Sequence, residues 1–105
     1  MMAGAAMERQ GPRLLRALHG NMQRAGFANP EELAWEASLS VTVVSDIFSG
    51  AEPHPRDSHL SRIAFAFAVR MSRDNKVIIT LRNSLRDSFK ELRDADDRDR
   101  LKNQP

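Results

Sequence analysis

Apolar residues recur at steps of three and four along most of the chain, and these steps divide it into helical segments. Within residues 12–24, Leu14, Leu18 and Met22 follow one another at steps of four. That spacing predicts an amphipathic helix with one buried stripe. Gly26 follows the stripe closely and is suited to ending this first helix.

The second segment carries a strong helix-start signal. Asn29 is a preferred N-cap residue, Pro30 suits the first helical position, and the two glutamates that follow suit the positive end of the helix dipole. Leu33 and Ala34 open its buried face. The helix is predicted to be short and to stop near Ser38.

Residues 39–50, LSVTVVSDIFSG, pose the main conformational question of the sequence. The β-branched run at 41–44 favours a strand by propensity alone. A strand with one buried face needs strict alternation, however, and two adjacent valines break it. Ser40 is a good N-cap and Gly50 a good helix stop, so the segment is predicted to be a helix.

A proline-containing loop at 51–57 separates this helix from the next one. Asp57 or Ser58 is predicted to cap the fourth helix, which reads HLSRIAFAFAV. Its expected core face consists of Leu60, Ile63, Ala64 and Phe67.

The last periodic segment, residues 74–94, is predicted to be a long helix, although a short strand over 77–80 remains an alternative start. From Ala95 onward the chain is almost entirely charged or polar and is predicted to fray. The apolar stripe of this helix either packs on its own domain or pairs with a second copy. It comprises Ile78, Leu81, Leu85, Phe89 and Leu92.

Two short helices joined by a tight turn define a helix-turn-helix. The positions that carry a more specific pattern are Leu33, Ala34, Ala37, Leu39, Ser40, Val44, Ser45, Ile47, Gly50, Leu60, Ile63, Ala64, Phe67 and Val69. At these positions the chain resembles the Cro/phage-repressor-like (XRE-type) helix-turn-helix family, over about residues 12–70. The resemblance implies an all-α, lambda-repressor-like bundle of four to five helices with an extra C-terminal helix.

The resemblance also implies sequence-specific binding to double-stranded DNA, with the third helix in the major groove and the second across the backbone. The residues expected at base edges are Val41, Thr42, Ser45 and Asp46. Those expected near phosphates are Asn29, Ser49, His54 and Arg56. The implied protein is a transcriptional regulator, with repression the expected sign, that binds a palindromic operator as a homodimer. The expected dimer or partner interface consists of Phe65, Ile78, Leu81, Leu85, Phe89 and Leu92.

Taken with the resemblance, the pattern divides the 105-residue chain into four parts. Residues 1–11 are a flexible leader, and residues 12–73 are the DNA-binding domain. Residues 74–94 are a C-terminal dimerisation or packing helix, and 95–105 are a charged flexible tail.

The exposed face of the third helix departs from the family. Relatives commonly place Gln, Arg, Lys or Asn there, whereas this chain places Val41, Thr42 and Asp46. None of these side chains makes the bidentate pair to guanine or adenine on which most direct readout depends. The alternative function is therefore a helix-turn-helix scaffold for protein interaction, an antiactivator or adaptor. Its partner surface would include Trp35 and Phe48.

Other functional classes receive no support from the residues. The chain has no cysteine, and its three histidines match no zinc spacing. No nucleophile with a base and an orienting group is evident, so neither an enzyme nor a bound cofactor is expected. No apolar run is long enough to span a bilayer, and the N-terminus lacks the features of a signal peptide. The expected location is the cytoplasm, in association with the nucleoid.

Overall fold

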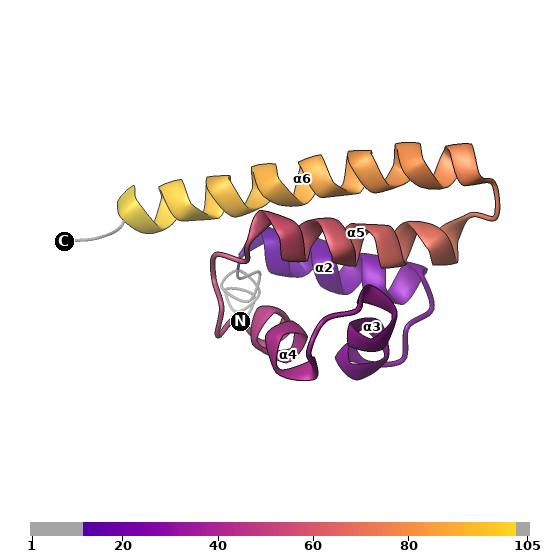
Figure 1. The fold of residues 1–105 in the computed structure, drawn as a ribbon. Helices are drawn as coiled ribbons and strands as arrows, with labels where there is room; N and C mark the ends of the chain where they lie inside the picture. The colour runs from indigo at the N-terminus through magenta and orange to yellow at the C-terminus, as the bar shows by residue number, and fades with distance from the viewer. Residues whose placement is uncertain (1–11, 103–105) are drawn as a thin grey trace, which may run out of the picture.

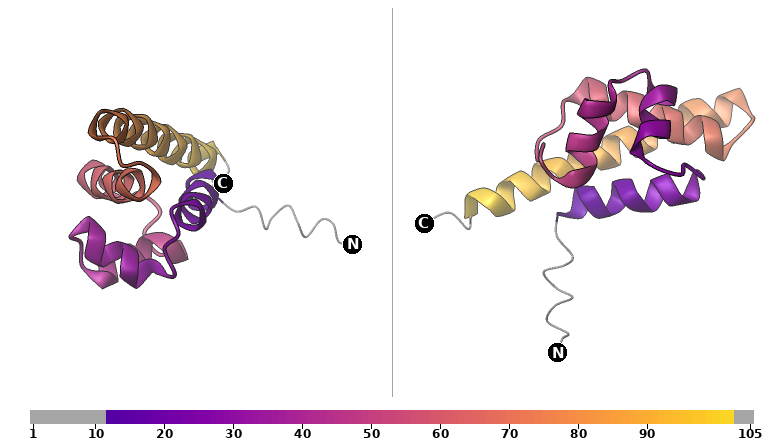
Figure 2. Two further views of the ribbon diagram at one scale, coloured as in Figure 1. Left: turned by 90° about the vertical axis from the view of Figure 1, so that its right-hand side faces the viewer. Right: turned by 90° about the horizontal axis from the view of Figure 1, so that it is seen from below.

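The computed structural model describes residues 12–102, and within that range all regular structure is helical. The helices are α2 (Arg13–Arg24), α3 (Pro30–Ala37), α4 (Val41–Ser49), α5 (Asp57–Met71) and α6 (Asn75–Lys102). Helix α5 occupies the middle layer (Figures 1 and 2), with α3 and α4 on one side and α6 on the other. The prediction of an all-α helix-turn-helix bundle is confirmed.

Residues 41–49 are helical despite their β-branched composition. The Ser40 hydroxyl accepts a hydrogen bond of 3.1 Å from the Val43 N–H, and Gly50 ends the helix with a φ of 88°. On the inner side of α4, Val44 and Ile47 are buried against the other helices. Valine and threonine each lower helix stability by less than about 0.7 kcal/mol relative to alanine, and two caps and a buried face outweigh this cost.

Helix α3 begins and ends as its sequence predicts. The Asn29 side chain accepts a hydrogen bond of 2.9 Å from the Glu32 N–H, and Pro30 is the first helical residue. The helix ends at Ser38, whose φ of 56° and ψ of 42° lie in the left-handed region. Ser38 is the one non-glycine residue with positive φ in the part of the chain described.

Replacing Ser38 with glycine is expected to raise the free energy of unfolding by up to about 1 kcal/mol. Glycine has no Cβ to clash in the left-handed region, whereas serine is strained there. Ser84→Gly is the matched control, because Ser84 is exposed within α6 in ordinary helical geometry. That control is expected to lower stability by about 0.5 kcal/mol. Urea unfolding of both variants measures the difference, and a loss of stability in Ser38→Gly would contradict the strain argument.

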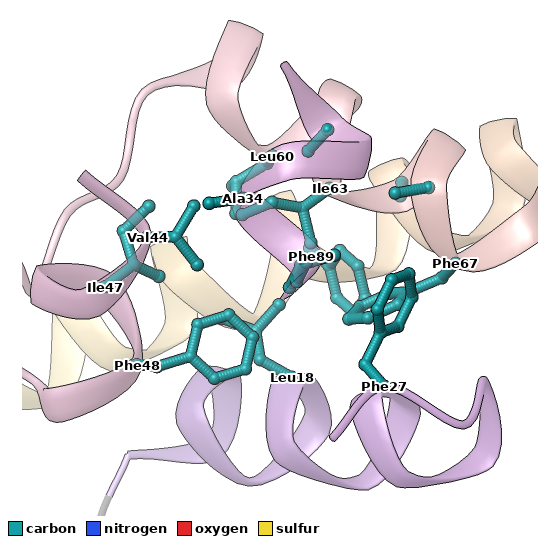
Figure 3. Close-up of a cluster of buried hydrophobic side chains, with 14 of the residues drawn as sticks. Leu18, Phe27, Ala34, Val44, Ile47, Phe48, Leu60, Ile63, Phe67 and Phe89 are labelled. Atoms are coloured by element: carbon teal, nitrogen blue, oxygen red, sulfur yellow. The ribbon is translucent and has the colours of Figure 1, made fainter. Parts of the chain in front are cut away.

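One hydrophobic core joins all five described helices (Figure 3). Within it, the Phe67 ring lies 6.0 Å from the Phe27 ring and 6.1 Å from the Phe89 ring. Phe89 belongs to α6 and is 1% exposed. The largest fully buried side chains are Phe67, Phe89, Leu18, Leu33, Ile47, Leu60, Ile63 and Val44.

Helix α6 is longer than its sequence pattern predicts. It is helical from Asn75, so the alternative of a short strand over 77–80 is wrong. It also continues through the charged segment to Lys102, so the prediction of a frayed tail is wrong for 95–102. The predicted tail residues 103–105, like the predicted leader 1–11, lie outside the described residues.

Asp96, in that charged segment, caps α2. Its carboxylate oxygens accept hydrogen bonds of 3.0 Å each from the N–H groups of Arg13 and Leu14. Pro12, at the N-cap position of α2, offers no side-chain acceptor. The N-terminal N–H groups of a helix need acceptors and favour negative charge. A carboxylate more than eighty residues away in the sequence provides both.

Arg93 ties α6 to the start of α5. Its side chain is 8% exposed and donates to the Pro55 carbonyl at 3.0 Å and to the Asp57 carboxylate at 2.5 Å. The hydrogen bond from Arg93 holds the pKa of Asp57 below its ordinary value. Asp57 is the first residue of α5, so its ion pair with Arg93 connects the start of α5 to α6. The prediction that Asp57 or Ser58 caps α5 is wrong, because the N-cap is Arg56 and makes no side-chain cap hydrogen bond.

Candidate functional site

The outer face of α4 is open to solvent. Thr42, Ser45 and Asp46 are exposed, and Val41 is 37% exposed. These are the residues predicted to meet base edges, and they share the side of α4 that points away from the core. A nine-residue helix with one buried and one open side presents a narrow polar ridge to any partner.

The turn between α3 and α4 is held rigidly behind this face. The Leu39 N–H donates to the Ala34 carbonyl at 3.0 Å, which closes the end of α3. Arg62 of α5 donates to the Ser38 carbonyl at 3.1 Å. The left-handed residue of the turn is thereby hydrogen-bonded to α5, which connects the turn between α3 and α4 to a neighbouring helix.

Three of the four side chains predicted to lie near phosphates already have partners within the protein. The Asn29 oxygen caps α3, and the Ser49 hydroxyl donates to the Asp46 carbonyl at 3.3 Å. The His54 ring nitrogen Nδ1 lies 2.5 Å from a carboxylate oxygen of Asp97. The Arg56 side chain is exposed and has no hydrogen-bond or ion-pair partner among residues 12–102. Arg56 is thus the cation of this set that is directly available to a ligand.

The outer face of α4 carries one carboxylate, that of Asp46. Asp46, Glu52, Arg56 and His59 line one hollow beside the helix. The sequence of α4 itself, VTVVSDIFS, contains no Arg or Lys. The predicted DNA-facing surface is therefore weakly acidic, with Arg56 at its edge.

The residues predicted to form a dimer interface divide into two groups. Phe89 is in the core, and Leu85 and Leu92 pack against it while partly buried, so these three side chains serve their own domain. The prediction of Phe89 as an interface residue is wrong, because the side chain is 1% exposed within its own domain. Leu85 and Leu92 are partly exposed, and their place in an interface stays a prediction. Phe65 is 46% exposed. The remaining predicted interface residues, half-buried and outside the core cluster, are Ile78 and Leu81.

The two aromatic residues predicted for a protein partner also differ from each other. Phe48 is 5% exposed, with its ring 5.1 Å from the His19 ring in an edge-to-face arrangement. Phe48 is therefore a core residue, and its prediction as a partner contact is wrong. Trp35 is 81% exposed on the outer side of α3.

The sequence analysis missed the polar residues that attach α6 to the rest of the protein. Asp96 and Arg93 are the charged residues of α6 that are buried. Both residues belong to a run of charged residues. Nothing in the sequence of that run distinguishes the buried charges from those exposed to solvent. Only the distant partners, the start of α2 and the start of α5, distinguish them.

Several other kinds of site find no basis in residues 12–102. No group of three or more His, Asp or Glu side chains is placed to hold a metal ion in this range. Over the same range no helix has both the length and the apolar content needed to cross a membrane.

Comparison with known proteins identifies no similar protein. No protein-family model, curated protein or solved structure matches the chain. The architecture defines an all-α helix-turn-helix bundle, and the function must be argued from its own surfaces.

Proposed function

We propose that the chain is a DNA-binding transcriptional regulator, with repression the expected sign, that acts as a homodimer. The observation that carries the proposal is the orientation of α4. Its outer face, with Thr42 and Asp46, is free, while α3 and a fixed turn hold its inner face. A helix presented in this way fits the major groove of B-DNA, which is about 12 Å wide.

The chemistry of that face limits how it reads bases. Val41 and the methyl group of Thr42 suit contact with thymine methyl groups, and Asp46 suits the cytosine amino group as an acceptor. Arg56, at the start of α5, is suited to a phosphate oxygen of the flanking backbone. Each contact is individually modest, so specific binding is expected to need two half-sites.

The homodimer follows from the same argument. A single small helical domain contacts one half-site of an operator. A two-fold dimer contacts both half-sites of a palindromic operator and doubles the contact area. Phe65, Ile78 and Leu81 are the members of the predicted interface that remain outside the core. Removing α6 is unsuited to testing dimerisation, because the same cut removes Phe89 from the core.

A binding selection on random DNA duplexes with the purified protein tests this function. The expected result is an enriched palindrome whose affinity falls steeply with salt, since neutralised phosphates release counterions. Thr42→Ala is expected to relax base preference at one position of each half-site by about 1 kcal/mol. Arg56→Gln is expected to weaken binding to all sequences and to reduce the slope of log K against log salt by about two, because the dimer loses one phosphate contact in each half-site.

Thr80→Ala is the matched control for base preference, because Thr80 is an exposed threonine on α6, which α5 separates from α4. It is expected to leave the base preference unchanged. A flat salt response, or an equal effect of Thr42→Ala on every sequence, would contradict the proposed reading of DNA by α4.

The second candidate is a helix-turn-helix scaffold that binds a protein and not a specific DNA site. The observation that favours it is the charge of the α4 face, which bears Asp46 without any Arg or Lys in the helix. An acidic helix is repelled by phosphates at low salt. Failure of the duplex selection to enrich any sequence is the outcome expected from this alternative.

A further inference from the structure

Trp35 is an exposed aromatic residue without a structural role in its own domain. It is the single tryptophan of the chain and is 81% exposed. Its ring contacts no other aromatic ring among residues 12–102, and its indole N–H has no hydrogen-bond partner there. The buried residues of α3 are Leu33, Ala34 and Ala37, on the opposite side.

The surroundings of Trp35 are acidic. One hollow is lined by Trp35 together with Glu31, Glu32 and Glu36. Arg70 of α5 donates to the Glu36 carboxylate, and this hydrogen bond holds the pKa of Glu36 below its ordinary value. The carboxylate therefore stays ionised near neutral pH.

Arg70 does not cancel the negative charge of this surface. It lies 3.7 Å from Glu32 and 2.5 Å from Glu36, so one guanidinium serves two carboxylates. The same guanidinium stacks over the Phe27 ring at 4.0 Å, which turns it toward the body of the protein. Glu31 has no ion-pair partner among residues 12–102. Trp35 thus stands among carboxylates with a net negative charge.

We propose that Trp35 and the glutamates around it form a docking surface for a basic segment of a partner protein. A Lys or Arg side chain binds favourably to the face of an indole ring, and neighbouring carboxylates strengthen that attraction. Tryptophan is also the residue type that most often contributes a large share of binding energy at protein interfaces. Charge complementarity selects a partner segment rich in Arg or Lys, with an apolar residue against the indole edge.

This surface lies outside the face proposed for DNA. It belongs to the outer side of α3, whereas Val41, Thr42 and Asp46 belong to α4. The carboxylates of Glu31, Glu32 and Glu36 would repel phosphates. The inference therefore extends the molecule's role to recruiting a protein, and it stands or falls independently of DNA binding.

A displayed library of random peptides, selected against the full-length protein, tests the proposal. The expected result is enrichment of peptides that combine Arg or Lys with apolar residues. Because the chain holds one tryptophan, binding of a synthesised peptide is expected to shift the emission of Trp35 toward the blue as the ring loses water. Trp35→Ala is expected to weaken peptide binding, followed by calorimetry, about thirtyfold.

Glu31→Gln provides a second variant that leaves the indole in place. It is expected to weaken binding about twofold to fivefold and to reduce the dependence of binding on salt. Leu101→Ala is the matched control, because Leu101 is a large apolar residue that is 69% exposed at the far end of α6. It is expected to leave peptide affinity unchanged.

Four outcomes would overturn the proposal. They are enrichment of peptides without cations, no enrichment at all, equal binding by Trp35→Ala and the native protein, and association of the protein with itself that Trp35→Ala abolishes. Affinity of Trp35→Ala for a selected DNA duplex is expected to equal that of the native protein. That measurement keeps a failure of the docking surface distinct from a failure of the proposed DNA binding.

Discussion

Replacing Phe89 with alanine is expected to lower the free energy of unfolding by about 3 to 5 kcal/mol. The side chain is 1% exposed, and its ring packs against Phe67 between α5 and α6. Its removal leaves a cavity at the junction of the core and the long helix. For a domain of this size, a loss of that magnitude is a large fraction of the total stability. Chemical denaturation followed by circular dichroism measures it.

Ile79→Ala is the matched control on the same helix. Ile79 is 53% exposed, so its truncation is expected to change stability by less than about 0.5 kcal/mol. A dimer interface centred on Phe89 would behave differently, with stability that rises with protein concentration. Comparable losses for Phe89 and Ile79 would contradict the packing of α6 described above.

Replacing Asp96 with alanine is expected to lower the free energy of unfolding by about 2 to 4 kcal/mol. The variant leaves the N–H groups of Arg13 and Leu14 without acceptors, and the second of these is buried. It also removes a negative charge from the positive end of the α2 dipole. Thermal unfolding and amide hydrogen exchange of the first turn of α2 report the effect.

The neighbouring Asp99 provides the control for Asp96. Its carboxylate pairs with Arg13 at 3.2 Å, but both side chains are about half exposed. Such a surface pair contributes little, so Asp99→Ala is expected to change stability by less than about 0.5 kcal/mol. If the two substitutions had equal effects, the buried carboxylate would not be the cap that stabilises α2.

Local chemistry made several elements predictable. Ser40 and Gly50 bounded α4 correctly because N-cap hydroxyls and left-handed glycines act within a few residues of themselves. Asn29 and Pro30 did the same for α3. The open face of α4, with Thr42 and Asp46, followed from helical periodicity once the buried positions were known.

Periodicity alone did not determine what each apolar stripe packs against. Phe89 and its neighbours on α6 form a stripe that suits either a partner chain or the chain's own core. Phe48 lies next to Ile47 on α4, at the edge of the apolar face. A residue at that edge is buried only if a neighbouring helix packs close to it. Whether α2 and α5 lie close enough to bury these side chains depends on the packing of the whole bundle.

By itself, the sequence determined the all-helical architecture, the caps of α3 and α4, and the free face of α4, because these depend on contacts between near neighbours. Only the tertiary structure decided that Phe89 and Phe48 are core residues and that Trp35 stands free among glutamates. It also decided that Asp96 caps α2, although the two lie at opposite ends of the described chain. Burial and capping between distant segments depend on which helices pack against each other. The pattern of residues within one helix does not specify its packing partners.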